Sequence, residues 1–403
     1  MANTLNLGNG NWATKEDSLL AYNSENGNFK PLPFSFSRAS SATVVNKAGL
    51  IETVGSGEPR IDFSNDAKGA LLLEPSRSNF IPYSNSFDNV AWEKGGTGTA
   101  SAPIVSANQG ISPDGTNNAF KVDFNLNGGT STSDRCRLTE LFTGTTATNY
   151  TFSYWIKAFN SSDIGKVFNF NVDNVDNFGS IVVTENWQRV VFTSQSTNSP
   201  INSHIQIRGS YGTSGSVSIL LYGFQAEVGS YPTSYIPTQG SAVTRVADVC
   251  NNGGNEQVIN STEGVLMAEI SALDDDLTNR IISLSDGTNS NIISVQFSNA
   301  QSNDIIAYYN ATGQTGRVIS TTSYNIKSFN KIALVWNNSS FKFYVNGYLI
   351  GSATIETPLV NNTLNQLKFQ YGNGTLPFYG NAKDLRLYNT ALTDAELQAL
   401  TTI

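Results

Sequence analysis

The sequence has few charged side chains, two cysteines, a single histidine and no long hydrophobic run. Asp, Glu, Lys and Arg make up only 14% of the 403 residues, whereas about 25% is usual in globular proteins. Glycine, asparagine, serine and threonine are frequent instead. Because these residues favour turns, the composition predicts many short strands joined by turns.

The charge and the hydrophobicity of the sequence argue against nucleic acid and membrane as partners. The formal net charge is −8 and no basic cluster is present, so we expect no nucleic-acid partner. No apolar run approaches the roughly 20 residues of a membrane-spanning helix, so we expect no membrane insertion. Residues 1–18 lack the basic start and apolar core of a signal peptide. We therefore expect a soluble chain that is synthesised in the cytoplasm.

Few residues are available for catalysis or for a transition-metal site. His204 is the only histidine, and the alternation in "SHIQIRG" places it on the polar face of a strand. Cys136 and Cys250 lie far apart in the sequence, and we expect two buried thiols rather than a disulfide scaffold. No carboxylates show glycosidase spacing, although Glu269 and the "LDDDL" stretch come closest. We therefore expect that the protein is not an enzyme.

The "LDDDL" stretch has two interpretations. A solvated turn is favoured, because three adjacent carboxylates repel one another and prefer water. The alternative is a calcium site formed by Asp274, Asp275 and Asp276, since hard cations take several carboxylate oxygens. Calcium is the one cofactor that remains possible at this point.

Three segments differ in their patterning. Residues 1–85 are irregular, and "KEDSLLAYNSE" predicts a short helix within them. Residues 86–250 and 251–403 each contain runs that alternate with period two and end at turn residues, which predicts two antiparallel β-sandwiches (jelly rolls). Asn346 and Gly347 predict a tight hairpin. Thr393 and Glu396 predict a capping box that opens a short C-terminal helix.

The stretch "YPTSYIPTQGSAVTRVADVC", residues 231–250, follows the last strand of the second segment. It is poorer in glycine and serine than a flexible linker. Pro232 and Pro237 stiffen it, and Tyr231, Tyr235 and Ile236 provide side chains to bury. We expect an ordered strap that lies on the second segment.

Alternation in three strands of the second segment predicts a polar face. It sets Trp155, Asn169, Asn171, Gln206 and Arg208 opposite their core-facing neighbours. If these strands share a sheet, one aromatic ring lies among amide and charged groups, which suits a sugar with an apolar face and many hydroxyls. The alternatives are an ordinary hydrated face or a contact with another subunit.

In the third segment, aromatic residues beside turns are further glycan-binding candidates, because loops commonly carry function. They are Tyr308, Tyr371 and Tyr379. Trp336 alternates in phase with Ile332 and Leu334, which indicates a core position instead.

Several stretches resemble known families. "FSRASSATVVNKAGLIETV", "EPRIDF" and "ALLLEPSRSNF" resemble a segment that recurs in bacteriophage virion proteins. "FQAEVGSYPTSYIPTQGSAVTRVAD" resembles the end of a jelly-roll module, similar to carbohydrate-binding modules, in such proteins. "NKIALVWNNSSFKFYVNGYLIGSA" and "YGNAKDLRLYNTALTDAELQAL" resemble a concanavalin A-like (laminin-G-like) lectin domain.

The resemblance implies a virion surface protein: a tail fibre, spike, head fibre or capsid decoration, commonly a trimer. It implies that residues 1–85 dock on other virion proteins, that residues 86–250 form a carbohydrate-binding-like jelly roll, and that residues 251–403 form the lectin-like domain. The expected function is adhesion to host-surface carbohydrate. A purely structural cement protein and a glycan-degrading tail spike are the alternatives.

Overall fold

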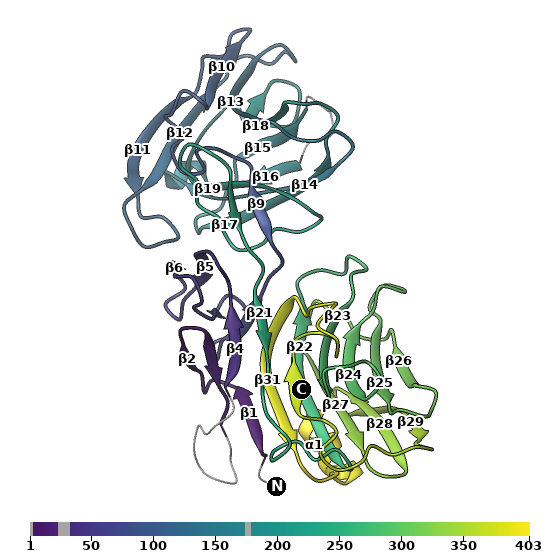
Figure 1. Cartoon of the computed structure of the whole chain (residues 1–403). Helices are drawn as coiled ribbons and strands as arrows, with labels where there is room; N and C mark the ends of the chain where they lie inside the picture. Colours follow the sequence, from purple (N-terminus) through teal and green to yellow (C-terminus); the bar gives the residue numbers. More distant parts are fainter. Residues whose placement is uncertain (1–2, 23–32, 174–178) are drawn as a thin grey trace. The chain divides into compact units, whose positions relative to one another are not determined.

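The computed structural model describes residues 3–22, 33–173 and 179–403, and it separates into two compact units. Unit 1 combines residues 1–48 and 54–75 with residues 246–403, and unit 2 contains residues 49–53 and 76–245. Antiparallel strands form nearly all the regular structure of the described residues, which confirms the predicted all-β class (Figure 1). Within these residues, no helix is long and apolar enough to span a membrane.

Two sheets form the body of unit 1. The larger has the order β29 (Tyr348–Thr354), β28 (Ser340–Val345), β27 (Asn330–Trp336), β22 (Gly264–Ala272), β31 (Gly380–Tyr388), β8 (Ala70–Leu73) and β7 (Ile61–Asp62), and β1 (Leu5–Gly8) also pairs with β31. The smaller has the order β26 (Arg317–Thr321), β25 (Ile305–Asn310), β24 (Ile292–Phe297), β23 (Arg280–Ser285) and β30 (Gln366–Lys368). Helix α1 (Asp394–Thr401) buries Leu397 against the outer side of the larger sheet.

Residues from the beginning of the chain complete this larger sheet. β1 pairs with β31 at Asp384–Leu387, and β8 pairs with the same strand at Gly380–Ala382. Alternate residues of these short strands, such as Leu5 and Leu71, enter the core of unit 1. A short apolar strand cannot bury its side chains alone, so it pairs with the sheet that offers a free edge. Unit 1 therefore combines strands from the beginning of the chain with strands from its end.

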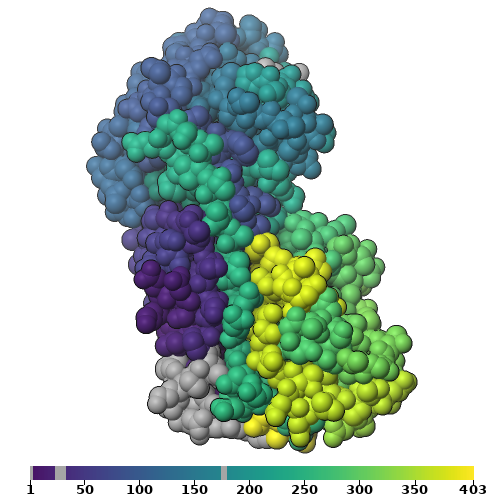
Figure 2. Space-filling view, viewed as in Figure 1, coloured from purple at the N-terminus to yellow at the C-terminus, as the bar shows by residue number. Residues whose placement is uncertain are grey.

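A smaller sheet of unit 1 has the order β2 (Ala13–Lys15), β3 (Ser18–Leu20), β4 (Phe34–Ser37) and β21 (Val249–Asn251). The helix predicted for residues 15–25 is wrong where the structure describes them: Lys15 pairs with Ser18 across a tight turn, and Asp17 has a φ of 58°. Residues 23–25 lie outside the described residues. The hairpin forms because β3 pairs with β4 and buries Leu19 in the core. In Figure 2 the purple N-terminal atoms lie beside the teal strip that contains β21.

Four of the motifs that resemble virion proteins meet in one buried ion-pair network of unit 1. Arg38 contacts Asp248 at 3.1 Å, and Arg60 contacts both Asp248 and, at 2.6 Å, Glu74. Arg38 also donates to the backbone carbonyls of Ser40, Gly55 and Glu58 and so holds this irregular segment in place. Burial alone lowers the pKa of Arg60, but Glu74 and Asp248 outweigh it, so that this pKa is raised. The Arg60 guanidinium is therefore charged.

Unit 2 is a sandwich of two five-stranded sheets. The first, called the β18 sheet, has the order β10 (Glu93–Thr97), β13 (Arg135–Phe142), β18 (Ile201–Arg208), β15 (Val167–Val172) and β16 (Gly179–Val182). The second, called the β14 sheet, has the order β11 (Ile104–Gly110), β12 (Ala119–Asn125), β19 (Ser216–Val228), β14 (Asn149–Ala158) and β17 (Gln188–Gln195).

The remaining short elements of the two units are β5 (Ala42–Val45), β6 (Ile51–Val54), the paired strands β9 (Arg77–Asn79) and β20 (Val243–Arg245), and the 3₁₀ turn η1 (Ser161–Asp163).

Several local predictions are confirmed. Cys136 and Cys250 are both free thiols in buried positions. Asn346 and Gly347 have φ values of 50° and 87°, as a type I′ hairpin requires. Thr393 and Glu396 form the predicted capping box of α1. Trp336 is a core residue with 1% exposure.

The strap after β19 is ordered and packs on unit 2. Tyr231, Tyr235 and Ile236 are buried there. The Glu227 carboxylate accepts the backbone N–H of Thr233 at 3.0 Å, and Gln225 accepts that of Ile236 at 2.6 Å. Extended backbone needs hydrogen-bond partners when it is covered, and these two side chains of β19 supply them.

The burial of Glu140 predicts that the stability of unit 2 depends on pH. Its side chain is 1% exposed, and its Oε2 has no hydrogen-bond partner in the described part of the chain. Burial raises its pKa to about 7, although Lys94 opposes the shift. A raised carboxyl pKa contributes stability that is complete below the unfolded pKa near 4.5 and is lost as the pH rises through about 7.

We therefore expect amide protection in β13 and β18 to fall between pH 5 and pH 8 in the wild type, and Glu140→Gln to remove that fall. Hydrogen exchange, corrected for intrinsic rates, measures it. Glu185→Gln is the control, because Glu185 is exposed and its removal leaves the slope unchanged. An unchanged slope in Glu140→Gln contradicts the assignment.

Candidate functional site

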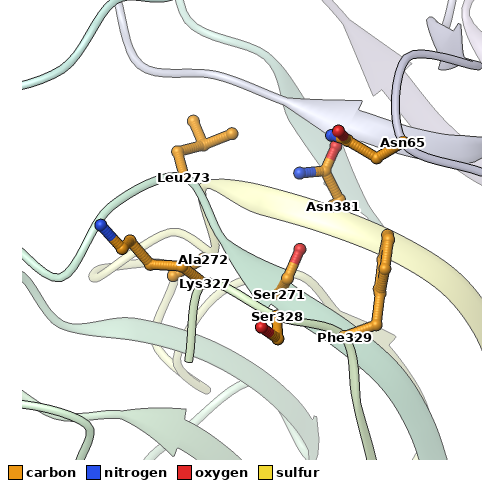
Figure 3. Close-up of a pocket in the computed structure, with 8 residues that line it drawn as sticks. All are labelled: Asn65, Ser271, Ala272, Leu273, Lys327, Ser328, Phe329 and Asn381. Atoms are coloured by element: carbon orange, nitrogen blue, oxygen red, sulfur yellow. The ribbon is translucent and has the colours of Figure 1, made fainter. Parts of the chain in front are cut away.

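A pocket of about 440 Å³ opens in unit 1 where β22 ends and β31 begins (Figure 3). This volume lies within the range of about 300–1,000 Å³ that is usual for small-molecule sites. Its lining consists of Asn65, Ser271, Ala272, Leu273, Lys327, Ser328, Phe329 and Asn381. None of these residues is among the candidates predicted from sequence patterns.

The fold explains why these residues meet. Ser271 and Asn381 are register partners on β22 and β31, so their side chains leave the sheet on the same side. Phe329 lies directly before β27, and Asn65 lies in the turn between β7 and β8. Asn65 reaches the pocket only because the N-terminal strands join the larger sheet. Because the lining residues come from segments far apart in the sequence, local sequence patterns do not reveal this site.

Ion pairs fix the walls of the pocket. The Lys383 ammonium contacts Asp66 at 2.6 Å and Glu269 at 3.0 Å, and it lies 5.5 Å from the centre of the Phe329 ring. Burial alone lowers the pKa of Lys383, but Asp66 and Glu269 outweigh it, so that the pKa is raised. Lys383 is therefore charged and ties the turn that carries Asn65 to β31.

The chemistry of the lining suits a sugar. The side chains of Asn65, Ser271 and Asn381 make no hydrogen bond to the described part of the chain. Figure 3 shows them in the pocket wall together with the Phe329 ring and the Lys327 chain. Amides and hydroxyls can exchange hydrogen bonds with sugar hydroxyls in both directions. An aromatic ring offers a surface to the apolar face of a pyranose.

The predicted glycan-binding face of unit 2 is only partly assembled. Asn169, Asn171, Gln206 and Arg208 do lie on one face of the β18 sheet, since Gln206 pairs with Asn169 in register. The premise that Trp155 shares their sheet is wrong, because Trp155 belongs to β14 in the other sheet. Period-two alternation assigns a residue to a face but cannot say which strands become neighbours.

Trp155 instead supports the strap. Its ring contacts Tyr235 at 5.8 Å between centroids, and the Arg189 guanidinium lies 4.5 Å from the ring centre. Arg189 also donates to the carbonyl of Thr233 at 2.7 Å. Trp155 thus packs against Tyr235 of the strap and against Arg189.

The three candidate tyrosines of unit 1 are not equivalent. Tyr308 on β25 and Tyr371 after β30 interact through their side chains, and burial, followed by the influence of Tyr308, raises the pKa of Tyr371. Tyr379 is half-buried directly before β31. Tyr308 and Tyr371 thus form a side-chain pair, and the role of all three tyrosines in glycan binding stays a prediction.

The three aspartates considered as a calcium site have separate partners. Asp274 lies 3.5 Å from the Lys327 ammonium, Asp275 accepts from the hydroxyl of Ser302 and the N–H of Asn303, and Asp276 accepts from Arg280 at 2.7 Å. Among the described residues, no three His, Cys, Asp or Glu side chains are grouped to hold a metal ion. The chain does not bring these aspartates together around one point.

Comparisons with known proteins assign part of the chain. No curated protein matches it. Solved structures that it resembles include the CBM40 of the Ruminococcus gnavus IT-sialidase bound to alpha2,3 sialyllactose, with 20% identity, coverage of 35% of this chain and 83% of that chain, and a TM-score of 0.31. Domain 4 of AbnA, a GH43 extracellular arabinanase from Geobacillus stearothermophilus in complex with arabinotriose, has 13% identity, coverage of 43% and 82%, and a TM-score of 0.32.

One family model matches within unit 1. Residues 268–398, about a third of the chain, match the model described as the Concanavalin A-like lectin/glucanases superfamily. The match begins within β22 and ends within α1, so it leaves out β1, β7 and β8 of the same sheet. Residues 268–398 are thus the concanavalin A-like, laminin-G-like part of this chain.

Proposed function

We propose that the chain is a bacteriophage virion surface protein that binds glycans on the host surface. The observation that carries the glycan-binding part is the pocket in the concanavalin A-like unit, with its aromatic ring and its unengaged amides and hydroxyl. The virion part is supported by the motifs around Arg38, Arg60, Glu74 and Asp248. Several copies on one particle convert weak contacts into avidity.

The test is glycan binding by the whole chain on an array of host-surface saccharides. For any saccharide that binds, Phe329→Ala is expected to weaken the affinity about tenfold, which corresponds to about 1.4 kcal/mol. The variant removes the ring from the pocket and leaves the sheets intact. Tyr348→Ala is the matched control, because this aromatic residue is 69% exposed on β29 and does not line the pocket.

The alternatives give different outcomes. A cement protein binds no glycan, and particles that lack it lose stability rather than adsorption to cells. A tail-spike enzyme shortens host capsule polysaccharide during incubation with the purified chain. The adhesion proposal requires glycan binding without shortening, and equal affinity of Phe329→Ala and Tyr348→Ala contradicts the pocket as its site.

A further inference from the structure

Two polar side chains in the pocket of unit 1 are buried but unengaged. Asn381 is 9% exposed and Ser271 is 3% exposed, and both line the pocket. Neither side chain makes a hydrogen bond to another residue among those that the structure describes. Buried amides and hydroxyls in folded proteins nearly always have a partner. The pocket therefore holds one amide and one hydroxyl that are available to a ligand.

The larger sheet fixes both side chains in place. Ser271 on β22 and Asn381 on β31 are register partners, and Asn381 is also the register partner of Leu72 on β8. β31 therefore has a paired strand on each side at Asn381. The backbone N–H of Ala272 donates to the carbonyl of Ile326 at 2.7 Å, which ties the end of β22 to the loop before β27. Groups that are already held lose little conformational freedom when they bind a ligand.

An apolar part of the lining accompanies the two polar groups. It consists of Leu273 and the Phe329 ring. Leu273 follows Ser271 by two positions, and alternate residues of extended backbone point to the same side. Figure 3 shows the Leu273 side chain and the Phe329 ring in the wall that also contains Asn381. The pocket thus suits a ligand group that has polar atoms and a small apolar part close together.

The charged groups at the pocket already have partners. Among the described lining residues only Lys327 is ionised, and its ammonium lies 3.5 Å from Asp274. Next to the lining, Lys383 contacts Asp66 at 2.6 Å and Glu269 at 3.0 Å. A carboxylate on a ligand would compete with these three carboxylates for the two ammonium groups, and juxtaposed like charges repel one another. The pocket therefore favours an uncharged ligand.

An acetamido group combines the features that this lining can bind. It has an N–H that donates, a carbonyl that accepts and a methyl group, and it carries no charge. Because a secondary amide is planar and trans, its N–H and its carbonyl point in opposite directions and need two separate partners. The Asn381 amide can donate to the carbonyl, and the Ser271 hydroxyl can accept the N–H. Leu273 can contact the methyl group, whereas a sugar hydroxyl would leave Leu273 without a ligand contact.

We propose that the pocket of unit 1 binds a neutral N-acetylated sugar and that Asn381 and Ser271 hold its acetamido group. The inference rests on the proposed glycan binding and adds the chemical class of the ligand. Asn381 and Ser271 determine specificity, because an acetamido group satisfies both side chains and covers Leu273, whereas a hydroxyl does not. Phe329 contributes affinity through the apolar face of the sugar ring, whichever group the sugar carries.

The experiment titrates the whole chain, by calorimetry, with saccharides that differ only in this group on each ring. The pairs are chitotriose with cellotriose, and the methyl glycosides of N-acetylgalactosamine and N-acetylmannosamine with those of galactose and mannose. We expect at least one acetamido probe to bind about tenfold more tightly than its hydroxyl counterpart, or better. Asn381→Ala is expected to lower that ratio to about threefold or less, because the donor to the carbonyl is lost. Asn361→Ala is the matched control, because Asn361 is an exposed asparagine of the same unit that does not line the pocket.

Thermal unfolding curves show that each variant is folded. Ser271→Ala is a second variant, which removes the acceptor, keeps the amide and is also expected to lower the ratio. Phe329→Ala should weaken both members of a pair by a similar factor and leave the ratio unchanged. If the chain binds saccharides but prefers no acetamido probe, this inference is overturned and the adhesion proposal stands, whereas binding of no saccharide overturns both. A ratio that stays the same in Asn381→Ala and Ser271→Ala also overturns the inference.

Discussion

Asp248→Asn is expected to lower the free energy of unfolding of unit 1 by about 3–5 kcal/mol, the usual cost of removing one partner from a buried ion pair. Asp248 has no exposed side-chain surface, and it contacts Arg38, Arg60 and the backbone N–H of Glu74. Its loss leaves two buried guanidinium groups with Glu74 as their remaining carboxylate in the network. Uncompensated buried charge costs far more than an exposed pair contributes.

Urea denaturation, followed in unit 1, measures this change. Glu256→Gln also removes one carboxylate but at an exposed position of the same unit, so its effect should stay within about 0.5 kcal/mol. Amide protection in the β18 sheet is an internal reference, because unit 2 does not contain the network. A loss below about 1 kcal/mol for Asp248→Asn contradicts the role assigned to the network.

A fragment of residues 251–403 is expected not to fold, although it contains all the residues that match the concanavalin A-like family. The core of unit 1 includes side chains from residues before 76, namely Leu5, Leu7, Leu19, Ala21, Phe34, Phe36, Leu71 and Leu73. Burial of each large apolar side chain contributes about 1.5–3 kcal/mol. For the seven large side chains among them the sum is about 10–21 kcal/mol, which is as large as the roughly 5–15 kcal/mol by which a whole domain is stable.

The matched control is unit 1 with residues 76–245 replaced by a short Gly/Ser linker. The backbone N–H of Asp248 donates to the carbonyl of Glu74 at 3.0 Å, so the two chain ends that the linker joins lie close together. We expect this variant to show cooperative unfolding and native near-UV circular dichroism. A cooperatively folded 251–403 fragment would show that the N-terminal strands are dispensable.

Local patterns were sufficient for the all-β class and for features that depend on neighbouring residues. The Asn346–Gly347 turn and the Thr393–Glu396 cap need only a few adjacent residues, and both form as predicted. Burial of Trp336 likewise follows from period-two alternation, because a strand sends alternate side chains to opposite faces. These are properties of a single segment.

Which segments become neighbours was decided only by the tertiary structure. Pairing of β1 and β8 with β31 joins residues more than 300 positions apart, and it brings Asn65 to the pocket beside Asn381. Alternation placed Trp155 and Gln206 each on an outward face, but separate sheets carry them. The sequence of a strand contains no local signal that specifies which other strand it pairs with. The pairing partner is therefore determined by the packing of the complete core.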